Sequence, residues 1–308
     1  MTNYTSITMN ASRNVDLENE DIGINPEAII VIICVLNAPL LLISIFGNSL
    51  VLAAILRTPS LRSPSTVYLC SLAVSDLLVG LVVQPMYVAL VLRPGSFLLQ
   101  SYNMLALSCC GVSLSTMTAI SVDRFLALHC HMRYPNLMTE KRALCTTVSL
   151  WFACLILSCL YFWDRNIFFL TIVVCIALCV MISSFSYIRI YGIVHRHQLQ
   201  IRTQQQAVQN LNAEHNLSIV QRKESAINTF IYYICMILCY FPVLITLIAQ
   251  AVLPMQDNHL TVARAFATTV TFINSAINPF LYCWRTRELR MTVLKTVRNI
   301  IFRQTEGN

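Results

Sequence analysis

Seven long stretches that carry almost no charge run through this chain, and they constrain its fold more than any other feature. They comprise residues 28–56, 66–92, 97–122, 143–163, 166–188, 225–256 and 265–284. Asp76 in the second stretch is the single charge among them. A helix needs about 20 apolar residues to cross the hydrocarbon core of a bilayer, and a soluble domain of this size cannot bury seven such stretches. The sequence therefore predicts an all-α membrane protein built as a seven-transmembrane helix bundle.

The composition excludes the main alternatives. Of 308 residues, 56% are hydrophobic and only 11% are charged, against about 25% charged in soluble domains. Such values exclude a disordered chain, a coiled coil and an ordinary soluble enzyme. The 13 cysteines do not indicate the disulfide framework of a small secreted domain, and we expect no disulfide.

The basic residues gather on one side of the predicted membrane. With the N-terminus outside, 17 of the 21 Lys and Arg residues fall in cytoplasmic segments, as the positive-inside rule requires. The N-terminal segment, residues 1–27, holds five acids and two glycosylation sequons, at Asn3 and Asn10. We expect a multi-pass protein of the plasma membrane with a glycosylated extracellular N-terminus. The net charge of +7 does not indicate a nucleic-acid partner.

The chain after the bundle, which we place at residues 28–284, is basic and patterned. Over residues 285–302, apolar residues recur at helical spacing with Arg and Lys between them. This pattern predicts an amphipathic helix on the inner leaflet, in contact with membrane lipids, followed by a short cytoplasmic tail, residues 303–308. The longest loop, about 195–223, contains no proline. We expect helices five and six to extend into the cytoplasm there.

Asp76 is the one ionisable residue in the middle of a predicted span, where a charge is costly and faces the bundle interior. Polar residues at suitable depths in other spans are Asn48, Ser113, Asn274, Ser275 and Asn278. A carboxylate in this setting has to be paired, solvated or protonated. Either these residues hold waters or a small cation around Asp76, or they form a purely structural hydrogen-bond network. The residues alone favour neither interpretation.

Motifs in several spans add a resemblance. They are Gly47-Asn48, Leu72-Ala73-Val74-Ser75-Asp76, Asp123-Arg124-Phe125, Trp151, Tyr187, Cys239-Tyr240-Phe241-Pro242 and Asn278-Pro279-Phe280-Leu281-Tyr282. Together, in this order and in these spans, they resemble the rhodopsin-like (class A) G-protein-coupled receptors over about residues 28–302. The resemblance implies a receptor that transmits binding of an extracellular ligand to a heterotrimeric G protein. It also implies arrestin and receptor kinases as partners, and no enzymatic activity.

The resemblance further implies roles for individual residues. Asp76, Asn48, Ser113, Asn274, Ser275 and Asn278 would line a sodium and water site, the sodium ion being the only expected bound cofactor. The residues of G-protein coupling and of the activation switch would be Asp123, Arg124, Tyr187, Tyr240, Pro242, Pro279 and Tyr282. Pro242 removes a backbone hydrogen bond and kinks span six, so its inner half would swing outward on activation.

Some positions depart from the family pattern. The cysteine that usually bridges span three to the second outer loop is replaced by Leu99, and Cys179 stands where span five usually has proline. Arg222 occupies the span-six position of an acid that often holds Arg124, so we expect a weak lock and raised basal activity. The departures resemble those of the melanocortin, cannabinoid, lysophospholipid and adenosine receptors, but the ligand-binding residues of those receptors do not carry over.

The family's geometry also implies a ligand pocket. Its lining would be Gln84, Tyr87, Asn103, Ala106, Leu107, Cys110, Leu244, Leu247 and Thr268, with Arg264 at the rim. The lining is mostly apolar and suits a neutral or lipid-like ligand. Ordinary helix packing explains many of these residues equally well.

Other functional classes have weaker support. A hydrolase or metal enzyme needs His, Cys or carboxylates that converge at one depth, and the six histidines all lie outside the apolar stretches. A proton pump needs a relay of ionisable groups. The remaining alternative is a small-solute transporter of seven helices, which would carry its substrate without a G protein.

Overall fold

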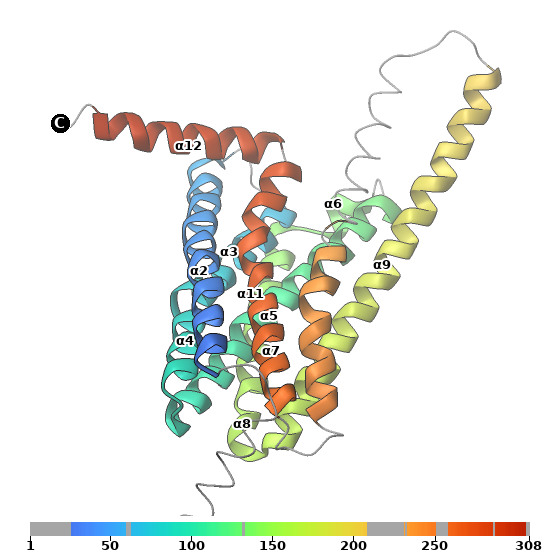
Figure 1. The fold of residues 1–308 in the computed structure, drawn as a ribbon. Helices are drawn as coiled ribbons and strands as arrows, with labels where there is room; N and C mark the ends of the chain where they lie inside the picture. The colour runs from blue at the N-terminus through green and yellow to red at the C-terminus, as the bar shows by residue number, and fades with distance from the viewer. Residues whose placement is uncertain are drawn as a thin grey trace, which may run out of the picture.

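Helices make up nearly all of the described chain. The computed structural model describes residues 26–59, 63–130, 133–207, 231, 233–250, 258–285 and 287–305, and these residues include no strand. Seven described helices are long and apolar enough to cross a membrane: Glu27–Arg57, Pro64–Leu92, Ser96–Cys130, Glu140–Trp163, Arg165–Arg196, Tyr233–Gln250 and His259–Trp284. The predicted bundle of seven transmembrane helices is confirmed (Figure 1).

The spans comprise the following elements. The first is α2 (Pro26–Arg57), and the second joins α3 (Pro64–Leu78), the π-helix η3 (Val79–Val83) and α4 (Gln84–Leu92). The third is α5 (Ser96–Cys130); α6 (Tyr134–Leu137) follows it; and the fourth joins α7 (Glu140–Ser158) and α8 (Leu160–Trp163). The fifth lies in α9 (Arg165–Ala207), the sixth is Tyr233–Gln250, and the seventh lies in α11 (Asn258–Arg285), before α12 (Arg287–Thr305).

Short polar caps begin the helices after tight loops. The Ser63 hydroxyl accepts the backbone N–H of Thr66 at the start of α3. Asp164 separates α8 from α9, and its Oδ1 accepts the N–H groups of Asn166 at 2.7 Å and Ile167 at 3.1 Å. Such side chains satisfy amides that have no partner within the helix. One capping residue is therefore enough to turn the chain between spans four and five.

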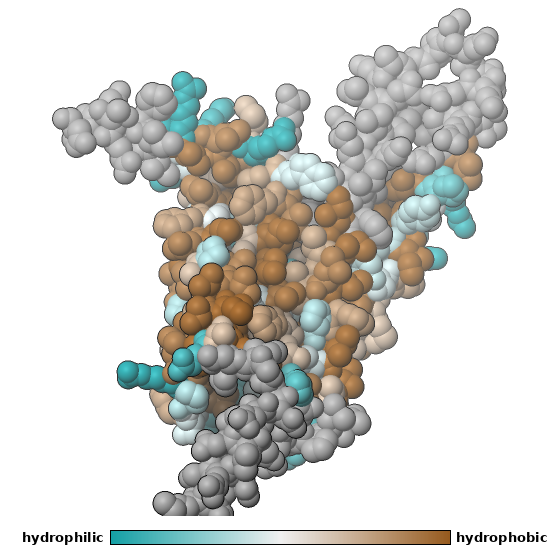
Figure 2. All heavy atoms as spheres, viewed as in Figure 1, coloured by the Kyte–Doolittle hydropathy of each residue, from teal (hydrophilic) through white to brown (hydrophobic). Residues whose placement is uncertain are grey.

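The third span lies at the centre of the bundle. Helix α5 packs against α3, α7 and α9, while α2 packs against α3 and α11. The side chains outside this core are apolar where they face away from the protein, for example Phe46, Phe152 and Ile188, each more than 60% exposed. Figure 2 shows this hydrophobic surface along the bundle. Apolar exposure of this extent is expected of a protein surrounded by lipid tails.

The second span contains a π-helical turn that the sequence analysis does not predict. The Gln84 N–H bonds the carbonyl of Val79, five residues back. Pro85 follows and has no N–H to continue the regular ladder. The wider turn rotates the outer part of the span relative to Asp76, and π-turns of this kind occur frequently at functional sites.

Two helices extend beyond the membrane-crossing region at the same end of the bundle (Figure 1). Helix α9 continues to Ala207, which confirms the expected extension of span five; the corresponding part of span six lies outside the described residues. Helix α12 crosses the end of the bundle and packs against α2 and α11. It begins two residues later than the predicted amphipathic helix and ends at Thr305. Its Leu289 is buried, while Met291 and Leu294 stay exposed.

Gly47 sets how closely the first and seventh spans approach. A Cβ atom added there would lie 2.8 Å from the Cγ of Pro279 in α11. Only a residue without a side chain fits this contact. At Gly192, by contrast, a Cβ would meet nothing within 4 Å.

We expect Gly47→Ala to unfold at a lower temperature than Gly192→Ala in thermal scans of the purified protein. Both variants gain similar helix propensity, so the difference isolates the clash with Pro279, which overpacking data put at about 1–3 kcal/mol. Equal stability of the two variants would contradict the close approach.

Candidate functional site

The carboxylate of Asp76 is fully buried and accepts three side-chain hydrogen bonds from two other spans. Ser113 Oγ and Ser275 Oγ each lie 2.9 Å from Oδ1, and Asn278 Nδ2 lies 2.7 Å from Oδ2. Asp76 and Ser113 have no exposed surface. The donors come from α5 and α11, so the carboxylate joins spans two, three and seven.

A second layer of bonds ties the first span to this cluster. Ser44 Oγ donates to the backbone carbonyl of Asp76 at 2.8 Å. Asn48 Nδ2 donates to the carbonyls of Ser44 and Ser275, at 2.9 and 3.0 Å. Asn48 therefore fixes the backbone around the cluster and makes no direct bond with the Asp76 carboxylate.

Several buried oxygens near this depth lack a donor among the described residues. They are the side-chain carbonyl oxygens of Asn48, Asn274 and Asn278. Asn274 donates its amide N–H to the sulfur of Met117 at 3.5 Å, which leaves its oxygen free to accept or coordinate. Buried polar atoms normally have partners, and hard cations and water both bind oxygen. The residues present thus fit a small cation or water beside Asp76.

A second buried carboxylate, Asp123, lies near the C-terminal end of α5. Its Oδ2 accepts from Ser65 Oγ at 2.8 Å, and its Oδ1 accepts from Tyr134 Oη at 2.7 Å. Arg124 Nε is 3.9 Å from Oδ2, at the outer limit of an ion pair. Asp123 is therefore held mainly by neutral hydroxyls.

Tyr134 lies outside the membrane-spanning segments, in α6. Burial and the bond to the Asp123 carboxylate raise the pKa of Tyr134 to about 12. The bond is stabilising while the phenol keeps its proton, so its contribution is complete below about pH 10, the phenol's ordinary pKa. It is lost as the pH rises toward 12.

The inner halves of spans three, five and six meet through two hydroxyl pairs. Ser121 and Tyr187 share a hydrogen bond of 2.9 Å, and Ser184 and Tyr233 share one of 2.6 Å. The two tyrosine rings lie 4.8 Å apart. Tyr187 of span five is therefore hydrogen-bonded to span three.

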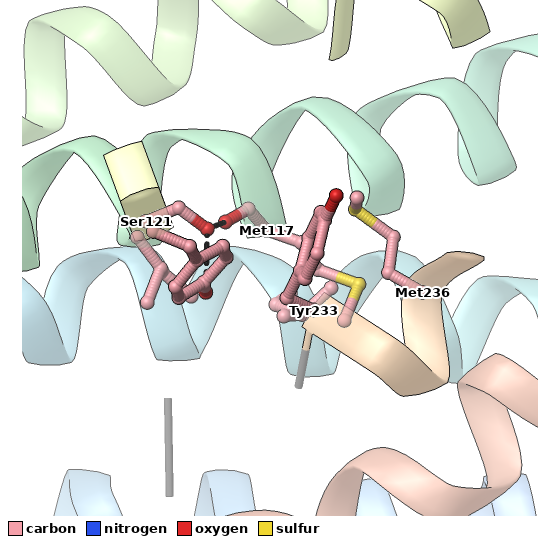
Figure 3. A pocket seen from close by; sticks show the side chains of 7 residues that line it. Met117, Ser121, Tyr233 and Met236 are labelled. Carbon is pink, nitrogen blue, oxygen red and sulfur yellow. Dashed lines mark hydrogen bonds between the residues drawn. The ribbon is translucent and has the colours of Figure 1, made fainter. Parts of the chain in front are cut away.

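A cavity of about 10 Å³ lies beside these pairs, with room for one water at most. Its lining residues are Leu72, Met117, Ile120, Ser121, Tyr187, Tyr233 and Met236. Figure 3 shows Ser121 and Tyr233 at this cavity, together with the two methionine side chains.

The two prolines of the switch motifs lie inside spans. Pro279 is within α11 and lies beside Gly47 of α2, and Pro242 lies within the continuous helix of the sixth span. Tyr240, two residues earlier, is buried and donates to the carbonyl of Cys110 at 3.3 Å. Tyr282 is almost fully buried in the main core.

The pocket residues suggested by the resemblance lie in the outer half of the bundle. Tyr87 packs with Ala106 and Cys110 in one cluster, and Leu244 packs at the edge of the main core. Leu247 is buried, and Leu107 and Thr268 are half-buried. Gln84 is fully buried, and neither polar atom of its side chain finds a partner among the described residues. Asn103 is buried with an unpaired amide nitrogen in the same part of the chain.

The remaining expectations concern the cysteines, the glycosylation sites, Arg222 and Arg264. All 13 cysteines lie in the described part of the chain and are free thiols. Asn3, Asn10 and Arg222 lie outside the described residues. Arg264 lies in the second turn of α11; its expected place at the rim of a ligand pocket stays a prediction.

Sequence reasoning missed the bonds between neutral hydroxyls. Ser65, Tyr134, Ser121 and Ser184 belong to none of the motifs, yet they hold Asp123 and the two tyrosines. Small hydroxyl residues are common in membrane helices, and their spacing alone does not reveal their partners. Only the helix register brings these pairs together.

Comparisons with known proteins agree with this architecture. Residues 47–167 match the family described as 7 transmembrane receptor (rhodopsin family). The chain is similar to melanocortin receptor 4 of Danio rerio, with 26% identity over 264 residues, which cover 82% of this chain and 79% of the relative. With seven spans and two buried carboxylate networks, these matches define a multi-pass membrane receptor. The chain is therefore similar to the rhodopsin family of seven-transmembrane receptors, for which G proteins are the expected kind of partner.

We expect Tyr134→Phe to lower the unfolding temperature, because it leaves one oxygen of the buried Asp123 carboxylate without its donor. Loss of a hydrogen bond to a charged group costs about 1.5–3 kcal/mol. The control is Tyr191→Phe, since Tyr191 is 73% exposed. If both variants melt alike in thermal scans of the purified receptor, the bond to Asp123 has no structural role.

Proposed function

We propose that this receptor lies in the plasma membrane with its N-terminus outside and transmits binding of a lipid-like extracellular ligand to a heterotrimeric G protein. Arrestin and receptor kinases would act on the same cytoplasmic face. The observation that carries the proposal is the arrangement at the inner end of α5. There a buried Asp123 is fixed by Ser65 and Tyr134, and the adjacent Arg124 lies at the limit of ion-pair distance.

The arrangement supports a mechanism in which Arg124 becomes available when spans three, five and six separate. The Ser121–Tyr187 and Ser184–Tyr233 bonds hold these spans together. They join neutral hydroxyls, which contribute about 0.5–1.5 kcal/mol each. A ligand with a modest preference for the separated state is enough to shift such an equilibrium.

Pro242 gives span six a place to bend. A proline inside a helix removes one backbone hydrogen bond and its ring displaces the preceding turn. Tyr233 and Met236 lie on the inner side of this proline and line the small cavity. Outward motion of this segment would break the Ser184–Tyr233 bond and open the cavity toward the cytoplasm.

The Asp76 cluster would hold a sodium ion in the resting receptor. When bound, the ion supplies a positive charge that compensates the buried carboxylate. The Asp76 carboxylate and the serine hydroxyls around it offer oxygen atoms that can bind a cation. The side-chain oxygens of Asn274 and Asn278 accept no hydrogen bond from the described residues, so they can bind it as well. These residues orient one another across three spans and keep bulk water out of the cluster.

Arg124→Ala is expected to reduce basal G-protein activation to the level of mock-transfected cells. The guanidinium is the group that would meet the G protein, and alanine cannot replace its charge. The measurement compares wild type and variant, at matched surface density, across a panel of Gα subunits. Wild type should signal above mock through one Gα class.

The matched control for this measurement is Arg133→Ala, an exposed arginine at the same end of the bundle. It should keep most of the basal signal. A signal that survives in Arg124→Ala would contradict the proposed role. Wild-type signalling at the mock level would remove the expectation of raised basal activity.

Sodium chloride should raise the unfolding temperature of the purified receptor relative to choline chloride at equal ionic strength. Asp76→Asn should abolish this difference, because the amide carries no charge to attract the ion. A difference that persists in Asp76→Asn would place the ion elsewhere, and a wild type insensitive to sodium would remove the site.

A further inference from the structure

Arg264 places a charged group inside the outer half of the bundle. It lies in the second turn of α11 and is half-buried. Its Nη1 donates to the side-chain oxygen of Gln250 in span six at 2.7 Å. Its guanidinium carbon lies 5.0 Å from the centre of the Phe169 ring of α9. The guanidinium thus bridges spans five, six and seven.

These two contacts orient the guanidinium without neutralising it. Arginine carries five N–H donors in a fixed plane that matches a carboxylate or phosphate. The Gln250 amide is neutral and accepts from one of them, and the Phe169 ring offers only a weak cation–π attraction. A half-buried charge with neutral partners keeps a strong preference for an anion.

The described residues provide no such anion. No carboxylate among them lies within 4 Å of Arg264. Asp164 stands at the same end of the bundle, but its Oδ1 caps α9. Arg165, the first residue of α9, is instead close enough to repel Arg264. The local field is therefore positive.

Aromatic side chains form the wall next to Arg264. Tyr87 donates from Oη to the carbonyl of Ala265 at 2.8 Å, and its ring lies 5.7 Å from that of Tyr102 and 5.5 Å from that of Phe272. The cluster around Tyr87 continues inward through apolar residues. A molecule that reaches Arg264 would therefore meet rings and aliphatic groups beyond it.

The amide of Asn103 is an independent sign of a missing acceptor. Asn103 follows Tyr102 on α5 and is 7% exposed, and its Nδ2 has no acceptor in the described chain. A buried donor without an acceptor costs about 1–3 kcal/mol. In the same half of the bundle, span three thus presents a donor that the described residues do not satisfy, and span seven presents a guanidinium bonded to the neutral Gln250.

From these observations we infer that the outer half of the bundle recognises an amphipathic ligand with an anionic head, a carboxylate or a phosphate, and that Arg264 binds this head. The inference rests on the proposed receptor function and specifies its ligand class. It keeps the lipid-like body expected from the apolar lining and replaces a neutral head with an acidic one. Phe169 and Gln250 are positioning residues, because they hold the guanidinium plane.

The test uses the full-length receptor in nanodiscs of neutral phosphatidylcholine, titrated with three probes that share one acyl chain. They are oleate, 1-oleoyl lysophosphatidate and the neutral 1-oleoylglycerol. The unfolding temperature reports binding. We expect at least one anion to reach half-maximal stabilisation at a concentration at least about 10-fold lower than the neutral probe, since charge-assisted hydrogen bonds favour the acid by this order. The more potent anion identifies the head group.

Arg264→Gln should abolish the preference for the anion, and Arg264→Lys should retain part of it, because lysine keeps the charge but loses the planar fork. The matched control is Arg93→Gln, an exposed arginine at the same end of the bundle, which should behave as wild type. If Arg264→Gln does not fold, the proposal is tested by the anion preference of wild type, which should be reduced in Arg264→Lys.

Equal potency of the acids and the neutral probe on wild type would overturn the inference, as would an anion preference that persists in Arg264→Gln. This assay contains no G protein. A receptor that activates a Gα subunit but shows no anion preference would refute only the ligand class. A receptor that binds the anion but activates no Gα subunit would refute only the proposed coupling.

Discussion

The buried Asp76 carboxylate is the interaction on which the rest of the structure depends. A buried carboxylate needs hydrogen-bond donors, and the hydroxyls of Ser113 and Ser275 and the amide of Asn278 supply them from two other spans. In a bilayer the hydrophobic effect does not drive helices together, and packing and interhelical hydrogen bonds do so instead. One carboxylate thereby sets the relative depth and rotation of spans two, three and seven.

The C-terminal end of α5 repeats this design with two bonds in place of three. Asp123 is again buried, but its partners are Ser65 and the loop residue Tyr134. Spans five and six are tied to span three and to each other through neutral groups, among them the pairs Ser121–Tyr187 and Ser184–Tyr233, and through the apolar packing around them. The contacts between spans five and six and span three thus involve no charged group among the pairs named, which fits the outward motion that we propose for span six.

The sequence predicts much of this because hydropathy and charge act over whole segments. Seven apolar stretches give seven spans, and an isolated acid at mid-span requires polar partners, three of which bond it directly. Asn48 and Asn274 bond other groups instead, Asn48 the backbone and Asn274 the sulfur of Met117. The π-turn before Pro85 and the Tyr134 bond depend on helix rotation and loop path, which residue spacing does not encode. Likewise, the contact of Arg264 with Gln250 depends on how spans six and seven pack, which residue spacing does not encode.

A double-mutant cycle between Asp76→Ala and Asn278→Ala tests the central role of this carboxylate most directly. The stability of wild type, both single variants and the double variant is measured on the purified receptor. Asn278→Ala leaves Oδ2 of Asp76 without its donor, and Asp76→Ala leaves Asn278, Ser113 and Ser275 without their acceptor. The two serines lose their acceptor in Asp76→Ala and in the double variant alike, so their loss cancels in the cycle. For the remaining Asp76–Asn278 bond the account predicts a coupling energy of about 0.5–3 kcal/mol. Strictly additive effects would show that the Asp76 carboxylate does not hold α11 in place.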